Sequence, residues 1–107
     1  MSRVLNNLCW HDGNLVSILF GIDNKGRSTV QIAAQLYKNQ EAPNRDAYQI
    51  SCEGVGRFNS TLDATELKGN AFAGNISSGY LKDKTLWVYL SDGLIEVHAA
   101  KFRVIKC

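Results

Sequence analysis

The chain has 107 residues, which is enough for one hydrophobic core but not for two. Its 12 basic and 10 acidic residues nearly cancel, and this balance excludes the strong overall field that would attract nucleic acid or an anionic membrane. The sequence has no run of 18 apolar residues to span a bilayer, and its first residues lack the apolar core of a secretory signal.

The number of cysteines indicates in which cellular compartment the protein works. Cys9, Cys52 and Cys107 cannot form a complete set of disulfides, and Cys52 sits in a strand pattern as a small buried hydrophobe. An odd number of thiols fits a reducing environment. We therefore expect a single cytoplasmic domain spanning residues 1–107.

The first half of the chain predicts three antiparallel strands. Residues 15–22 are apolar on both faces, whereas residues 29–37 and 47–53 alternate apolar with polar side chains. The glycines at positions 54 and 56 then predict a bulge or bend. In the first strand, the side chains expected to share one face are those of Val16, Ile18, Phe20 and Ile22.

One short helix is expected next, over residues 64–68. Asp63 can cap its first amides, Glu66 stands at the third helical position, and Gly69 suits the left-handed residue after the helix. The irregular segment that follows is expected to hold a short edge strand near residues 76–81.

The clearest motif is a β-hairpin over residues 85–99. An Asp-Gly pair at positions 92–93 suits the positive φ angles of a two-residue type I′ turn. Chain closure on that turn would pair Leu90 with Ile95, Val88 with Val97, and Leu86 with Ala99 on a core face.

The other face of this hairpin is aromatic and partly polar. Trp87 would stand across from His98 and Tyr89 across from Glu96, with Tyr80 nearby in sequence. Aromatic side chains beside lysines can hold single-stranded nucleic acid or a small ligand, so Tyr80, Trp87, Tyr89 and His98 form the candidate binding face. The plainer alternative is that another segment or a second copy covers it. An uncovered face of this size favours a homodimer with Trp87 near its centre.

The last strand changes phase. Continued alternation from Ala99 would turn Lys101 inward, whereas Phe102 and Val104 need that face, so we expect a bulge over residues 99–101. About six short strands in one small domain predict an all-β fold. The expected architecture is a small antiparallel β-sandwich or rolled sheet with one short helix.

Reactive side chains cluster at Cys9, His11 and Asp12. With the distant His98 they could surround a metal, but the paired ligands typical of zinc sites are missing. The sequence also lacks a nucleophile elbow and a glycine-rich phosphate loop. We therefore expect no metal, no cofactor and no enzymatic activity. The plainer interpretation is that Trp10 packs on the sheet edge and Asp12 begins a turn into the first strand.

The sequence Trp10-His11-Asp12, followed directly by a strand, resembles the opening of small bacterial immunity-type proteins. The resemblance implies a cytoplasmic, non-enzymatic protein that binds and neutralises a toxin. It identifies no residue that contacts the toxin, and this chain departs from strongly acidic members of that class by its net charge of +2. We expect a non-catalytic binding protein with a protein partner, and a nucleic-acid or small-ligand binding module is the alternative.

Overall fold

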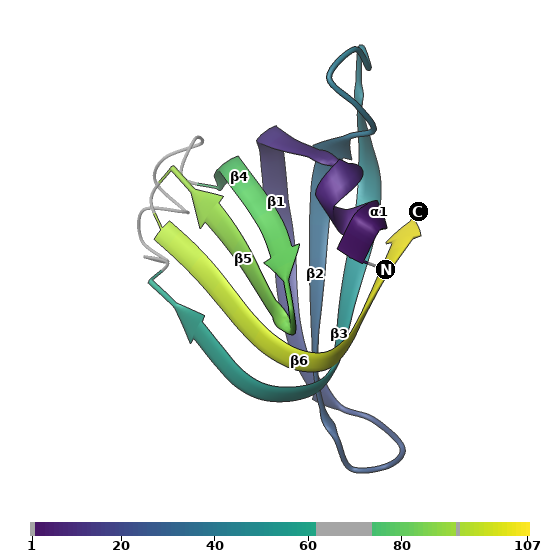
Figure 1. Cartoon of the computed structure of the whole chain (residues 1–107), viewed down its shortest axis with the longest axis vertical. Helices are drawn as coiled ribbons and strands as arrows, with labels where there is room; N and C mark the ends of the chain where they lie inside the picture. Colours follow the sequence, from purple (N-terminus) through teal and green to yellow (C-terminus); the bar gives the residue numbers. More distant parts are fainter. Residues whose placement is uncertain (1, 62–73, 92) are drawn as a thin grey trace.

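The chain folds into a closed antiparallel β-barrel with a short helix at its N-terminus (Figure 1). The computed structural model describes residues 2–61, 74–91 and 93–107. Around the barrel the strand order is β1-β2-β3-β6-β5-β4, and β1 pairs with β4 to close it. The elements are α1 (Ser2–Asn7), β1 (Cys9–Ile22), β2 (Ser28–Tyr37), β3 (Arg45–Ser60), β4 (Asn75–Lys82), β5 (Thr85–Leu90) and β6 (Gly93–Lys106).

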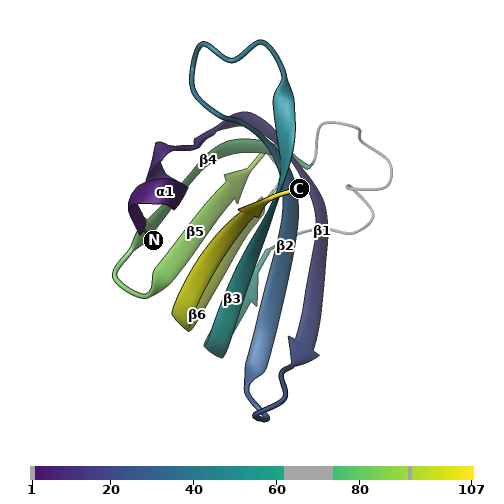
Figure 2. The ribbon, with the colours of Figure 1, turned by 90° about the vertical axis from the view of Figure 1, so that its right-hand side faces the viewer.

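This architecture confirms the all-β prediction and decides between its two forms. The sheet rolls into a barrel, because each strand pairs with a neighbour on both sides, and the sandwich is wrong. Figure 2 shows β5, β6, β3, β2 and β1 following one another around the wall. The short strand expected near residues 76–81 is β4, which pairs with β5 along its length and with β1 only at Asn75 and Ile76. The helix predicted over residues 64–68 lies outside the described residues.

The barrel closes because β3 and β6 bend together. Gly54 has a φ of +66°, a conformation that glycine adopts without steric cost. The register of β3 against β6 shifts between Val55 and Arg57, and Figure 1 shows both strands curving across the molecule. The bulge predicted at the paired glycines is confirmed.

The change in the inward–outward alternation that was expected in the last strand occurs in β6 where it bends beside Gly54. Ala99 and Phe102 are buried, whereas Ala100 and Lys101 between them are exposed. A Cβ on Gly54 would lie 3.1 Å from the Cβ of Ala100, so the two backbones approach closely here. The extra residue, however, lies on β3 and not on β6, where it was expected.

The hairpin prediction is right about its faces and wrong about its register. Gly93, which was expected in the turn, belongs to β6 and pairs with Leu90; residue 92, the other half of the predicted Asp-Gly turn, lies outside the described residues. Side chains alternate with a period of two, so a shift of two residues leaves each one on its predicted face. Apolar alternation alone therefore could not distinguish the two registers. The observed pairs are Leu86 with Val97, Val88 with Ile95, and Leu90 with Gly93.

The six-residue helix α1 is an element that the sequence patterns did not predict. It packs against β4, where Nδ2 of Asn6 donates to the Leu81 carbonyl (3.0 Å) and its Oδ1 accepts from the Leu81 amide (2.8 Å). Leu5 is fully buried, and its carbonyl accepts a hydrogen bond from the Trp10 indole at 2.9 Å. Within the described ranges, no helix has the length and apolar character needed to cross a membrane.

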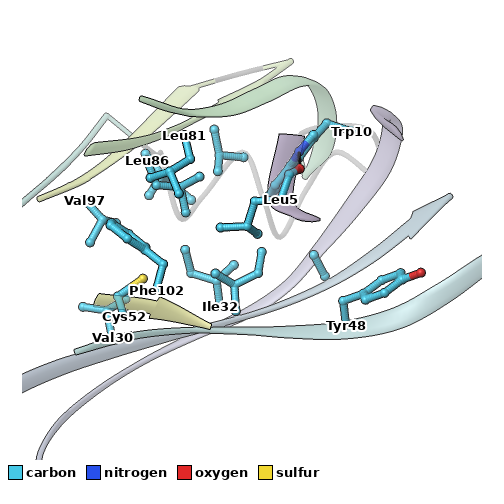
Figure 3. Packing of buried hydrophobic residues seen from close by; sticks show 14 of the residues in the cluster. Leu5, Trp10, Val30, Ile32, Tyr48, Cys52, Leu81, Leu86, Val97 and Phe102 are labelled. Carbon is cyan, nitrogen blue, oxygen red and sulfur yellow. Dashed lines mark hydrogen bonds between the residues drawn. The ribbon is translucent and has the colours of Figure 1, made fainter. Parts of the chain in front are cut away.

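The core fills the barrel interior, and Figure 3 shows Leu5 of α1 pointing into it among strand residues. Cys52 is fully buried, as expected, and burial raises the pKa of its thiol to about 12. The largest fully buried side chains are Leu5, Ile32, Leu36, Ile50, Ile76, Leu86, Ile95, Val30, Val88, Val97 and Cys52.

Gly79 lies at a point of very tight packing. A Cβ at this position would lie 2.5 Å from Cδ2 of Trp10, whose ring is buried. Gly79→Ala should lower the free energy of unfolding by about 1–3 kcal/mol, because overpacking forces side chains and backbone to shift. Urea unfolding followed by circular dichroism measures the change. Gly56→Ala is the control, since a Cβ there meets no atom within 4 Å; equal losses in both variants would contradict the packing argument.

Candidate functional site

Three aromatic side chains lie together on the outside of the barrel. Tyr80 of β4 pairs with Trp87 of β5, and Tyr89 lies two residues further along β5. We call Tyr80, Trp87 and Tyr89 the outer aromatic face. Because neighbouring side chains on a strand point to opposite faces, these rings point away from the core that holds Leu81, Leu86 and Val88.

The rings of the outer aromatic face stack on one another. The ring centroid of Tyr80 lies 4.9 Å from that of Trp87 at an interplanar angle of 29°, and 6.4 Å from that of Tyr89 at 20°. The side chains of Tyr80 and Tyr89 also share a hydrogen bond, which is the main reason that the pKa of Tyr89 is raised. Cross-strand aromatic contacts of this kind stabilise a sheet. The face is therefore an ordered ladder, in which Tyr80 and Tyr89 remain 41% and 37% exposed.

A polar cluster borders this face on β6 and β3. Glu96 pairs with Trp87, and its carboxylate accepts a hydrogen bond from Nδ2 of Asn59 at 3.1 Å and lies 3.2 Å from Nε2 of His98. The pKa of Glu96 is lowered, first by the Asn59 hydrogen bond, with further contributions from His98 and the Trp87 indole. The other ring nitrogen of His98 lies 3.1 Å from the Thr85 hydroxyl. The cluster thus fixes a carboxylate beside the rings.

A hollow lies in the outer surface of the barrel beside His98. Arg57 of β3 pairs with His98, and Lys84, in the turn before β5, lines the hollow, so two cationic residues lie on this part of the surface. The hollow measures about 300 Å³ and is lined by Gly54, Gly56, Lys84, His98, Ala99 and Ala100.

All four residues of the predicted binding face lie on one surface of the barrel. The predicted cross-strand partners need correction, however, because Trp87 stands across from Glu96, and His98 stands across from Thr85. Sequence reasoning missed Asn59, which reaches Glu96 from 37 positions away. No local pattern could have identified it, because its position depends on the pairing of β3 with β6.

The residues of the N-terminal motif separate in the structure. Trp10 is buried in the core and not on a sheet edge, whereas His11 and Asp12 are exposed. Asp12 has a φ of +64°, and the register of β1 against β2 shifts between Cys9 and Asn14. The turn predicted at Asp12 is therefore a bulge within a strand, which begins at Cys9 and not at residue 15.

A second hollow, of about 580 Å³, lies beside this bulge. Nε of Arg45 donates to the Asp12 carbonyl at 2.7 Å, and its guanidinium lies 5.2 Å from the centre of the Tyr37 ring. These contacts hold the bulge against β2 and β3. In the part of the chain that the structure describes, no three His, Cys, Asp or Glu side chains converge to hold a metal ion. The hollow is lined by Cys9, His11, Asp12, Tyr37, Asn39, Gln40, Ala42 and Pro43.

Comparison with known proteins informs the fold alone. No protein-family model and no curated protein matches the chain. A crystal structure of an uncharacterized protein from Neisseria gonorrhoeae is similar, with a TM-score of 0.52 and 13% sequence identity over 91% of this chain and 93% of that chain. At this identity, the similarity concerns the course of the backbone.

Glu96 should make stability depend on pH in a defined direction. Because its pKa is lowered in the folded state, its ionised form favours folding above the usual carboxyl pKa of 4.5, and this contribution is lost as the pH falls through the folded value. Glu96→Gln should therefore be less stable than the wild type near pH 7, and the difference should shrink by about pH 3. Urea unfolding at both pH values measures it.

Asn59→Ala tests whether the hydrogen bond from Asn59 causes the lowered pKa of Glu96. Removal of the main hydrogen bond to the carboxylate should move the pKa of Glu96 back toward 4.5, as followed by an NMR titration. A stability difference between Glu96→Gln and wild type that does not change with pH would contradict the assignment.

Proposed function

We propose that this chain is a non-catalytic binding protein and that the outer aromatic face recognises a protein partner. The observation that carries the proposal is the stacked ladder of Tyr80, Trp87 and Tyr89, in which both tyrosines are exposed and the tryptophan is half-buried. Tyrosine and tryptophan are enriched at the centres of protein interfaces, where they supply large contact areas. Since stacking already orders these rings, binding costs little additional side-chain entropy.

Two features favour a protein over single-stranded nucleic acid. Bases stack on open ring faces, whereas the ring of Tyr80 already stacks on Trp87 and Tyr89. The carboxylate of Glu96 borders the face and would repel backbone phosphates. A net charge of +2 offers little overall attraction to offset that repulsion. Nucleic acid remains the alternative because cations lie near His98.

The most specific form of this proposal is an immunity-type protein that neutralises a toxin, as the resemblance at Trp10-His11-Asp12 implies. The buried position of Trp10 gives that residue a structural role, so we assign recognition to the outer aromatic face. The three cysteines are free thiols, which supports our proposal that the protein works in a reducing cytoplasm.

Trp87→Ala should weaken partner binding at least about tenfold, because truncation of a central interface tryptophan commonly costs more than about 1.4 kcal/mol. The probe is the purified product of the neighbouring gene, titrated by calorimetry. Gln31→Ala, an outward-facing position on β2, is the matched control and should bind as the wild type does. Undiminished binding by Trp87→Ala would contradict the assignment of the face, and no binding by the wild type would contradict the immunity-type proposal.

Tryptophan fluorescence tests the nucleic-acid alternative. Trp10 is 4% exposed, so a Trp10→Phe variant reports from Trp87 alone. Titration with a mixed-sequence oligonucleotide at low salt should leave its emission unchanged. A saturable change that added salt reverses would instead favour nucleic acid.

A further inference from the structure

The hollow of about 300 Å³ beside His98 contains no residue of the outer aromatic face, and we call it the β6 hollow. It is lined by residues of β3 and β6 and by Lys84, at a place where β6 runs between β3 and β5 (Figure 1). A Cβ placed on Gly56, one of the lining residues, would meet no atom within 4 Å. The space beside this glycine is therefore open to a small ligand.

Cationic side chains stand on both sides of the β6 hollow. His98 of β6 pairs with Arg57 of β3 on one side and with Thr85 of β5 on the other. Lys84 directly precedes Thr85, and its carbonyl accepts a hydrogen bond from the Ala99 amide at 3.1 Å, which fixes its backbone beside β6. Because neighbouring strands lie about 4.7–4.9 Å apart, the backbones of Arg57 and Lys84 are roughly 10 Å apart. Their long side chains can reach a small group between them.

Neither of these two cations has a partner within the described part of the chain. The side chains of Arg57 and Lys84 are exposed and form no ion pair and no hydrogen bond with the described residues. Two carboxylates on the same strands are already engaged: Glu96 in the polar cluster, and Glu53 with Nε of Arg103 at 3.7 Å. Unpaired cations beside an open hollow favour an anionic ligand, because such a surface concentrates negative charge.

His98 forms a fixed wall of the hollow, because both of its ring nitrogens are engaged. Nδ1 lies 3.1 Å from the Thr85 hydroxyl, and Nε2 lies 3.2 Å from the Glu96 carboxylate. Direct contacts to an anion would therefore come from the two unpaired cations. One charge opposes them: Asp83, next to Lys84 in the turn, is exposed and forms no ion pair with the described residues.

We propose that the β6 hollow binds a dianionic phosphate, either as the free ion or as a small monoester, between Arg57 and Lys84. A guanidinium donates two parallel hydrogen bonds to phosphate oxygens, and a lysine ammonium supplies a compact positive charge. A phosphate dianion matches both unpaired cations, whereas a carboxylate would leave one of them unmatched. The proposal goes beyond the proposed function, because its ligand is a small anion and the outer aromatic face takes no part.

NMR titration of the ¹⁵N-labelled protein with inorganic phosphate tests the proposal, with chloride added to hold the ionic strength constant. The amide signals of Gly54, Gly56 and Ala100, which line the hollow, should shift along saturable curves. Arg57→Gln and Lys84→Gln should each weaken binding about fivefold, because each removes a charged donor at an exposed site. Shifts that rise linearly and never saturate would overturn the proposal. Methyl phosphate, titrated in the same way, shows whether the hollow takes the monoester as well as the free ion.

Lys38→Gln is the matched control. This exposed lysine also forms no ion pair with the described residues, and it belongs to the loop between β2 and β3, which Figure 1 shows far from the turn between β4 and β5. The variant should bind phosphate as the wild type does. Equal weakening by Lys38→Gln and Lys84→Gln would indicate attraction to overall charge alone and would overturn the site. Acetate should bind at least about fivefold more weakly than phosphate, since it carries one charge and two oxygens; equal binding would overturn the choice of phosphate.

Two further variants leave both cations in place. Gly56→Leu should abolish the saturable shifts, because its side chain would occupy the hollow, and the open space at Gly56 allows the fold to be kept. Asp83→Asn should bind phosphate about twofold more tightly, since one opposing charge is removed, and asparagine tolerates the φ of +56° at this position. Undiminished binding by a folded Gly56→Leu would overturn the placement of the phosphate. The titrations contain no partner protein, so this proposal and the proposed function can fail separately.

Discussion

The joint bend of β3 and β6 at Gly54 is the constraint on which the rest of the structure depends. A small sheet closes into a barrel only if its strands coil and bend, and a bulge with a left-handed glycine provides this. Any side chain at position 54 would meet both an unfavourable φ of +66° and the Ala100 Cβ at 3.1 Å. Beyond the bend, the same strand delivers Asn59 to Glu96 and Phe58 to Phe20. One backbone position therefore arranges two separate surfaces.

Local alternation identified most of the strands and the faces of the hairpin. It placed Trp87 and Tyr89 opposite Leu86 and Val88, because side-chain direction depends only on the neighbouring residues of a strand. It missed the hairpin register, since a shift of two residues preserves every face. It also missed α1, because six residues give no periodicity, and the helix is held by contacts from Asn6 to Leu81.

The candidate site, too, was predicted from the sequence only in part. The aromatic composition of the outer face followed from alternation, whereas the polar border did not, because Asn59 joins it through long-range pairing. The sequence likewise predicted that residues 15–22 are apolar on both faces. Whether such a strand is covered depends on strand order around the barrel, which no periodicity encodes. Sequence patterns therefore predicted which residues share a surface, and the topology determined which of these surfaces remain open.

The two hydrogen bonds between Asn6 and Leu81 have a consequence for the order of folding. They join residues 75 positions apart, so α1 cannot dock on β4 until the whole intervening chain has been made. Until β4 has emerged, Leu5 lacks the strand against which its helix packs. Long-range pairing of this kind slows folding and prolongs the exposure of apolar segments. Closure of the barrel at Gly13 and Asn14 likewise waits for β4, so the core face of β1 and β2 stays open until that strand has been made.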